Sequence, residues 1–600
     1  MADECVILSA IGILKSPFAT DSVRQFHSVV PPVLKSSASC LGGEERMKRT
    51  LRSRPRPLIA IFCTLFATVV LGQPVPEPAA LEREAGIPIT DPLVIAKCGS
   101  CHARDDQGNL QRLSWERTTP EGWQDAVKQM ILVQGLSVTP AEARSIVKYL
   151  SGSHGLAPEE AEPVRYDTER RVHEETFILS DRLRETCAKC HSFARVLSWR
   201  RSAGEWKQFA DSHAARYQIR STAEAVAFLT TSAPLHSPAW DTGRSRSVAQ
   251  NLAGRWLVMA SMPGRGTYSG EMLIDRDGDD EYNTRVSLTS VKDGSRIVRS
   301  GRTVVFGGYA WRGRSQGDRS ARNPDDLTSE AREVLLIAPD QSAADGRWFW
   351  GQYQEFGFDV KLQRASADPA LLAVDRSSLR AGSRGSRIRL IGDQLPAQVV
   401  PADFDFGPGV SARRIVSNSP VEIVAELDVA ADAPLGKHDI LFRRSSLLAA
   451  IAIYDRIDYL KVTPDSIVAA FGDRTHPKGY QQFDAVGYWR GPDGKSHTRD
   501  DVALGPMDVS WSVQVFHAAE GSNADSVGTM NSLGLFTPAD KNPNLNFDTW
   551  VIATARDEKD KNGAPLIGKS YMVVTVPTYT FNGRRYVRDL DRWVDDGPER

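Results

Sequence analysis

The sequence predicts a multidomain α + all-β protein. An N-terminal α-helical domain (residues 73–240) is expected to precede an antiparallel β-barrel domain (241–365) and two immunoglobulin-like β-sandwich domains (366–455 and 456–600). Two observations carry this prediction. Before about residue 240, helix-capping residues repeatedly precede apolar residues at helical spacing. Beyond it, short apolar runs punctuated by glycine indicate strands. The chain of 600 residues has room for roughly three to five domains.

The amino-terminal segment has the pattern of an export signal. Within residues 47–72, a basic stretch precedes the apolar run Leu58–Leu71, and Gly72 follows. The run is shorter than the roughly 20 apolar residues that span a bilayer. We therefore expect cleavage near Gly72 and a soluble periplasmic protein. Residues 1–46 fit neither part of a signal, so we interpret them as a spurious upstream extension with Met47 as the initiator.

Two Cys-x-x-Cys-His pentapeptides, Cys98–His102 and Cys187–His191, lie in the predicted helical domain. Each supplies two thiols that can form thioethers with one haem, and a histidine placed as proximal iron ligand. A zinc site built from two Cys-x-x-Cys knuckles, or a thioredoxin-like dithiol, is the alternative. Neither explains a histidine directly after both pairs. The sequence thus predicts two covalently bound haem c groups, attached through Cys98, Cys101, Cys187 and Cys190 and ligated by His102 and His191.

The remaining composition limits other functions. The other three of the seven cysteines, Cys5, Cys40 and Cys63, lie upstream of residue 73, which leaves none for disulfides. The formal net charge of −1 offers no basic field for nucleic acid.

The region around the two pentapeptides reads as an internal repeat. After the first motif, Thr119-Pro120-Glu121 is a helix start, and Trp123, Val127, Met130 and Ile131 recur on one helical face. After the second, Ser202 to Glu205 reads as a capping box that starts a helix with Trp206, Phe209 and His213 on one face. Another capped helix is expected after each, from Thr139 and from Ser221. In both halves a tryptophan is followed seven positions later by a residue that can ligate iron.

This parallel predicts the sixth iron ligands. We expect His102 and Met130 at the first haem, and His191 and His213 at the second, because thioether and imidazole are both normal axial ligands. The alternative for Met130 is a core methionine that only packs. For His213 the alternative is an ordinary surface or core histidine, with His154, His173 and His236 as competing ligands.

Beyond residue 240 the sequence predicts β structure without a catalytic site. Asp275 to Asp279 resembles the opening of a calcium loop, but Val286 stands where a bidentate glutamate is required, so a hairpin turn is expected. Polar joints near Ala365–Pro369 and Asp455 bound a segment of about seven short strands, and a bacterial immunoglobulin-like pattern follows. No serine–histidine–acid set, phosphate loop or metal cluster stands out, so we expect these domains to serve as scaffold and subunit contact.

From about Glu82 onward, the chain resembles the alpha subunit of the periplasmic quinohaemoprotein amine dehydrogenases. The resemblance rests on the two pentapeptides, on Thr119 to Trp123 with Met130, and on Cys190 to Val196 with Trp206, Lys207 and His213. It implies an enzyme of three different subunits that oxidises primary amines to aldehydes. A cysteine tryptophylquinone on a small gamma subunit and a beta-propeller beta subunit are implied as partners. This chain would pass electrons from that quinone through two haems to a soluble cytochrome c or blue copper protein.

Two other functions fit parts of the pattern. One is a stand-alone dihaem electron-transfer or sensor protein whose β domains bind a surface or a signalling partner. The other is a dihaem peroxidase, which needs an open distal site at one haem. The paired candidates Met130 and His213 argue against the peroxidase.

Overall fold

The computed structural model describes residues 84–169, 175, 178–188, 190–219, 221–245, 251–516, 524–541, 545–560 and 562–577. The predicted upstream extension (1–46), the predicted signal peptide (47–72) and His173 lie outside the described residues. Among the described residues, no helix is long and apolar enough to cross a membrane.

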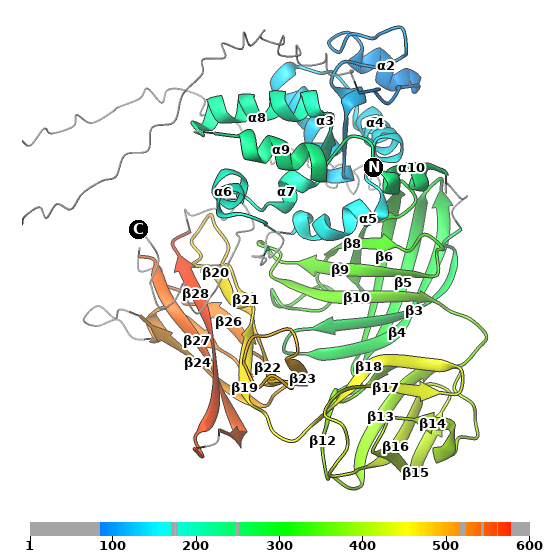
Figure 1. The fold of residues 1–600 in the computed structure, drawn as a ribbon, viewed down its shortest axis with the longest axis vertical. Coiled ribbons are helices and arrows are strands. Elements are labelled where there is room, and N and C mark those ends of the chain that lie inside the picture. Colours follow the sequence, from blue (N-terminus) through cyan, green and yellow to red (C-terminus); the bar gives the residue numbers. More distant parts are fainter. Residues whose placement is uncertain are drawn as a thin grey trace, which may run out of the picture. The chain divides into compact units, whose positions relative to one another are not determined.

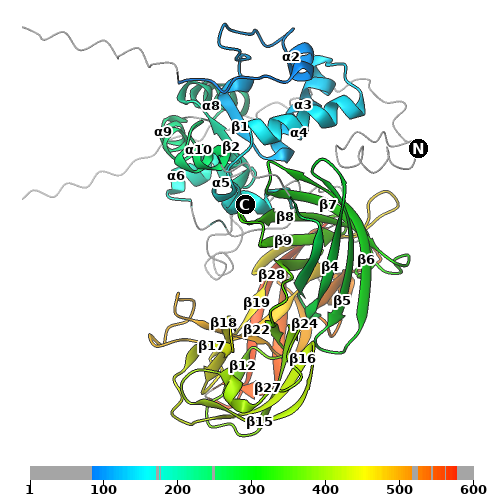
Figure 2. The same ribbon diagram turned by 90° about the vertical axis from the view of Figure 1, so that its right-hand side faces the viewer.

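The first described region is helical, with one short two-stranded ribbon (Figures 1 and 2). Strands β1 (Glu116–Thr118) and β2 (Trp199–Arg201) of this ribbon pair antiparallel. The helical turns are α2 (Pro92–Cys98), η1 (Leu113–Trp115), α3 (Pro120–Gln134), α4 (Pro140–Ser153), α5 (Pro158–Ala161), η2 (Glu162–Thr168), α6 (Asp181–Leu183), the π-helical turn η3 (Arg184–Ala188), α7 (Ala194–Leu197), α8 (Ala203–Tyr217), α9 (Ala223–Ser232) and α10 (Pro238–Ser245).

The helix starts follow the predicted caps at Thr119 and Thr139, with differences at Ser202 and Ser221. The helix expected from Ser221 is α9, whose N-cap residue is Thr222 and makes no side-chain cap hydrogen bond. The hydroxyl of Thr119 accepts the Gly122 N–H at 3.2 Å, and Thr139 forms a reciprocal capping box with Glu142. At Ser202 only half of the predicted box forms. Its hydroxyl accepts the Glu205 N–H, but its own N–H donates to the Trp115 carbonyl at 3.2 Å. That N–H is therefore already satisfied from the other half of the domain.

The internal repeat is present as structure. Helices α3 and α8 each follow one strand of the β1–β2 ribbon, and each ends in a left-handed residue, Gly135 or Gln218. The indole N–H of Trp123 donates to the His154 carbonyl at 2.9 Å, and that of Trp206 donates to the Ala233 carbonyl at 2.8 Å. The same carbonyls accept a backbone N–H from β1 and β2, respectively. Each half therefore packs a helix pair against one strand of a shared ribbon.

An antiparallel eight-stranded barrel follows, closed in the order β10-β3-β4-β5-β6-β7-β8-β9. Its interior is filled by large side chains such as Trp256, Trp311 and Trp348. The Asp275–Asp279 segment lies at the β4–β5 hairpin, as predicted. The strands are β3 (Gly254–Met262), β4 (Gly266–Gly278), β5 (Glu281–Ser290), β6 (Arg296–Phe306), β7 (Ala310–Gly317), β8 (Ala331–Ile337), β9 (Ala343–Trp350) and β10 (Phe356–Arg364).

The next domain is a sandwich of two four-stranded sheets, ordered β11-β13-β16-β15 and β12-β18-β17-β14. Ile388 and Ile423 of one sheet pack with Ile440 and Ile451 of the other in a single core. Eight strands occur where about seven were expected. They are β11 (Ala370–Val374), β12 (Ser378–Arg380), β13 (Ser386–Asp393), β14 (Phe404–Asp405, after turn η4, Pro401–Asp403), β15 (Val410–Ser419), β16 (Glu422–Val429), β17 (Gly436–Phe442) and β18 (Ser445–Tyr454).

The last domain is also built of packed β-sheets, ordered β19-β22-β23, β20-β28-β27-β24 and β21-β26-β25. Its strands are β19 (Tyr459–Thr463), β20 (Ser466–Ala470), β21 (Gln481–Gln482), β22 (Asp484–Trp489), β23 (Val502–Pro506), β24 (Val509–Val515), β25 (Gly528–Met530, after turn η5, Ala524–Ser526), β26 (Leu535–Pro538), β27 (Phe547–Lys559) and β28 (Pro565–Thr575). The predicted fold class, a helical domain followed by a barrel and two sandwiches, is confirmed.

Candidate haem-binding sites

The first Cys-x-x-Cys-His motif forms a tight turn at the end of α2. The Cys98 carbonyl accepts the N–H groups of both Cys101 (3.1 Å) and His102 (2.9 Å), which curls the motif back on itself. Cys98 is half-buried and Cys101 is exposed. The His102 ring places Nδ1 at 2.9 Å from the Gln111 carbonyl. Donation from Nδ1–H fixes the ring and leaves Nε2 as the ligating nitrogen.

The second motif begins within the π-helical turn η3. Like the first, it has one half-buried and one exposed cysteine and a histidine whose ring contacts a backbone carbonyl. Cys187 is half-buried and Cys190 is exposed, while the intervening Lys189 lies outside the described residues. The Nδ1 of His191 lies 2.9 Å from the Ser192 carbonyl. Each motif therefore offers one sheltered thiol, one accessible thiol and an imidazole whose Nε2 is free for a metal.

Burial disfavours the thiolate at the first cysteine of each motif. It raises the pKa of the Cys187 thiol to about 11, and burial together with the charge of Cys101 raises the pKa of Cys98. Within the described ranges, no three His, Cys, Asp or Glu side chains gather as a ligand set for one metal ion.

The rings of His191 and His213 lie next to each other in an edge-on arrangement. Their centroids are 6.5 Å apart and their planes are inclined by 70°. Metal–imidazole bonds are about 2 Å long, so two rings on opposite sides of one metal ion have centroids about 6 Å apart. Burial, with the charges of His191 and Arg216, lowers the pKa of His213 and favours the neutral imidazole that binds metal. This spacing and protonation state fit a haem iron held between the two histidines.

Met130 lies half-buried on α3, the counterpart of His213 on α8. Trp123 and Val127, on the same helix, pack in one core cluster with Cys98. The helix that carries Met130 therefore contacts the first motif. The Met130 thioether as the sixth ligand beside His102 stays a prediction.

Two of the competing histidines are engaged elsewhere. His154 is fully buried, with Nε2 at 3.1 Å from the Ile87 carbonyl and Nδ1 at 2.8 Å from the Ser153 hydroxyl. His236 places Nε2 at 2.7 Å from the Ala85 carbonyl. Both rings therefore serve the packing of the helical region.

A buried ion cluster joins the two halves and was not anticipated from the sequence. Arg117 of β1 and Arg200 of β2 are register partners, and both contact Glu160. The Arg117 guanidinium is completely buried and donates to both Glu160 oxygens at 2.8 and 3.0 Å. Burial alone would raise the pKa of Glu160, but the two arginines lower it to about 2. The only sequence signal is that Arg117 and Arg200 occupy corresponding positions of the repeat.

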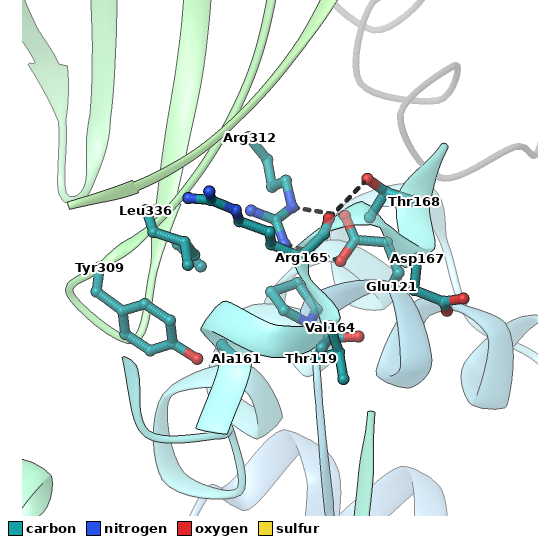
Figure 3. Close-up of a pocket in the computed structure, with 12 residues that line it drawn as sticks. Thr119, Glu121, Ala161, Val164, Arg165, Asp167, Thr168, Tyr309, Arg312 and Leu336 are labelled. Atoms are coloured by element: carbon teal, nitrogen blue, oxygen red, sulfur yellow. Dashed lines mark hydrogen bonds and ion pairs between the residues drawn. The ribbon is translucent and has the colours of Figure 1, made fainter. Parts of the chain in front are cut away.

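The helical region contacts the barrel through a second charged cluster of Glu121, Arg312 and Arg332, of which Figure 3 shows Glu121 and Arg312. Arg312 of β7 donates to Glu121 of α3 at 2.5 and 3.1 Å, and Arg332 of β8 contacts the same carboxylate at 3.1 Å. Burial opposes ionisation, yet these arginines lower the pKa of Glu121 to about 2. The adjoining cavity measures about 20 Å³, room for roughly one water molecule. It is too small for an organic substrate.

Comparison with known families accounts for most of the chain. Residues 89–228 match the family model for the haem-binding region of the quinohemoprotein amine dehydrogenase alpha subunit. Residues 249–365, 368–455 and 460–584 match the models for domains II, III and IV of the same alpha subunit. No curated protein matches the sequence at a significant level.

Several solved structures resemble parts of the β region. A redesigned beta barrel is 16% identical, with a TM-score of 0.16, and the match covers 19% of this chain and 92% of that one. The tandem Ig repeats of Dlar are 9% identical, with a TM-score of 0.13, and the match covers 35% of this chain and 100% of that one. A tandem from titin is 8% identical, with a TM-score of 0.11, and the match covers 51% of this chain and 98% of that one.

Proposed function

Since all four matched models describe one protein, the chain belongs to the family of the quinohemoprotein amine dehydrogenase alpha subunit, and we propose that it is the dihaem electron-transfer subunit of a periplasmic primary-amine dehydrogenase. As an alpha subunit it is part of an oxidoreductase that contains other subunits. The observation that most directly supports an electron-transfer role is that the ring of His213 lies 6.5 Å from the ring of His191, the histidine of the second Cys-x-x-Cys-His motif.

Each half of the helical domain would hold one haem. Cys98 and Cys101 would hold one haem c, with His102 and Met130 as axial ligands. Cys187 and Cys190 would hold the other, with His191 and His213. Haem iron with two protein ligands supplies reversible one-electron chemistry. The chain's own contribution is to orient each imidazole through its Nδ1 contact and to shelter one thiol of each pair.

The remaining parts of the reaction are assigned to partners. We propose that a cysteine tryptophylquinone on a small gamma subunit oxidises the amine, that a beta-propeller beta subunit completes the complex, and that a soluble cytochrome c or blue copper protein accepts the electrons. Among the described residues, each β domain packs its buried apolar side chains into a core, which is consistent with a scaffolding role.

Anaerobic mixing of the native complex with butylamine tests the proposed function. We expect haem absorbance to change from the oxidised to the reduced form, whereas the isolated chain should show no amine oxidation. If haems in the complex stay oxidised with every primary amine tried, the proposal fails and a stand-alone dihaem protein becomes the better assignment.

Intact mass tests the haem number and the processing. The native mature protein should carry two haem masses and lack residues 1–72, and Cys187→Ala with Cys190→Ala should lose one haem mass. A membrane-bound product that retains the apolar run Leu58–Leu71 would contradict the periplasmic assignment.

A further inference from the structure

Two acidic side chains hold the backbone that follows His191. The buried carboxylate of Glu175 accepts the N–H groups of Phe193 at 2.7 Å and Ala194 at 2.9 Å, and Asp167 accepts the Ser192 hydroxyl at 2.8 Å. Phe193 provides no side-chain cap for α7, so Glu175 satisfies the first N–H groups of that helix. Hydrogen bonds to a carboxylate are about twice as strong as neutral ones.

This backbone also orients the His191 ring. The contact that fixes the ring is its Nδ1 to the Ser192 carbonyl, one residue before the N–H groups that Glu175 holds. The peptide plane that accepts from the imidazole is thus anchored on its far side by Glu175. A shift of that plane would turn His191 relative to His213, to which it is now inclined by 70°.

Asp167 lies in η2, whose residues contact the barrel, and Glu175 is hydrogen-bonded to η2. The hydroxyl of Tyr166, in η2, donates to Glu175 at 2.8 Å. Glu169, directly after η2, pairs with Arg347 of β9, and both side chains are less than one-tenth exposed. Arg165 pairs with Asp345 of the same strand. Val164 and Ala194 share a core cluster with Tyr309 and Leu336 of the barrel.

The His102 imidazole is supported within its own loop, although the first half also contacts the barrel through Glu121 and through Phe306, which packs in one cluster with Cys98. His102 is oriented by Gln111, and the intervening turn is closed by Asp105, which accepts the Asn109 N–H at 2.8 Å. These contacts lie within ten residues of one another. The supports of the two imidazoles are therefore different in kind.

We propose that Glu175 is a positioning residue for His191, and that the barrel sets the angle between His191 and His213 through Arg347, Glu169 and the η2 segment. This inference rests on the proposed bis-histidine ligation of the second haem. It adds a role for the barrel beyond scaffolding: its rim helps to orient an axial ligand of the second redox site.

Electron paramagnetic resonance of the oxidised full chain tests the inference. In low-spin ferric haems, steeply inclined imidazole planes give a single low-field feature, and near-parallel planes give a rhombic three-line spectrum. The wild type should show the low-field feature. Glu175→Gln places an amide N–H₂ against a backbone N–H, so the feature should shift or split, and the midpoint potential of the bis-histidine haem should change with it.

Three further variants complete the test. Tyr166→Phe removes only the hydroxyl donor and should shift the feature in the same direction by less, which preserves the test if Glu175→Gln does not fold. Arg347→Met should also shift it. Glu121→Gln, which loosens the barrel contact of the first half, is the matched control and should leave it unchanged.

The outcomes separate the two proposals. A wild type without any bis-histidine signal overturns the ligation by His191 and His213 on which this inference rests, whereas the proposed function fails only if amines do not reduce the haems. A wild-type low-field feature that stays unchanged in Glu175→Gln and Tyr166→Phe overturns only the positioning role. A shift in Glu175→Gln with none in Arg347→Met overturns the role of the barrel.

Discussion

The two halves of the helical domain are built alike but supported differently. Helices α3 and α8 follow equivalent strands, present Trp123 and Trp206 to equivalent carbonyls, and carry Met130 and His213 at equivalent positions. Around the Cys-x-x-Cys-His motifs the likeness ends. The first imidazole is oriented by its own loop, and the second by a segment held against the barrel. Two halves with the same helix and strand arrangement can thus orient their motif histidines through different contacts.

The largest expected effect is at the ion cluster that joins the halves. Arg117 is fully buried and donates twice to Glu160, whereas Arg200 makes one contact with Glu160, at 3.3 Å, and otherwise donates to the Leu197 and Trp199 carbonyls. Arg117→Met should therefore destabilise the domain by about 3–5 kcal/mol, because it leaves a buried carboxylate under-compensated. Arg200→Met should cost about 1–3 kcal/mol. Urea titration of the full chain, followed at the Soret band, measures both, and equal costs would contradict the asymmetry.

Exchanging the axial ligand should remove the main chemical difference between the halves. Methionine raises the reduction potential relative to histidine, so Met130→His should lower the potential of the first haem. We expect a shift on the order of 0.1 V, about 2 kcal/mol for one electron. The sulfur-to-iron charge-transfer band should disappear. Spectroelectrochemistry follows both, and persistence of that band would show that another residue is the ligand.

The two indole hydrogen bonds test whether equivalent contacts in the two halves contribute equal stability. Trp123→Phe and Trp206→Phe each remove a buried hydrogen bond and some ring area, but the accepting carbonyl keeps a backbone donor. Each should cost about 1–2 kcal/mol, and the two values should agree within about 1 kcal/mol. A much larger difference in urea midpoints would mean that the halves share geometry without sharing stability.

The smallest effect concerns pH and the first half alone. Arg312 and Arg332 hold the pKa of Glu121 at about 2, below its ordinary 4.5. A lowered carboxyl pKa gives stability that is present above pH 4.5 and is lost as the pH falls towards 2. Glu121→Gln should lower stability by about 1 kcal/mol at neutral pH, because the cluster is partly exposed. The difference should vanish near pH 2, and a pH-independent difference in urea midpoints would contradict the ion-pair explanation.

Local signals in the sequence predicted much of this structure. Contacts between residues far apart in the sequence were not predicted. Thr119 and Thr139 cap their helices as expected because capping depends on the next three residues. The hairpin at Asp275–Asp279 and the barrel follow from strand patterns for the same reason. The β1–β2 ribbon was missed because three-residue strands such as Glu116–Thr118 show no periodicity.

At the candidate site too, the local motifs were predicted and the long-range contacts were not. The Cys-x-x-Cys-His motifs and the Met130/His213 parallel are visible in the sequence, and the structure brings His191 and His213 together. The supporting acids were not foreseen. Glu175 lies in no periodic segment, and its partners Phe193 and Ala194 could be identified only from the folded chain.

The β1–β2 ribbon also constrains the order of folding. Thr118 pairs with Trp199, so this ladder cannot form until both halves of the domain have been synthesised. Contacts between residues so distant along the chain form late, because the intervening loop must first be ordered. Before the second half has been added, strand β1 therefore has no partner in the ribbon. Ribbon closure then joins the two halves in one folded domain.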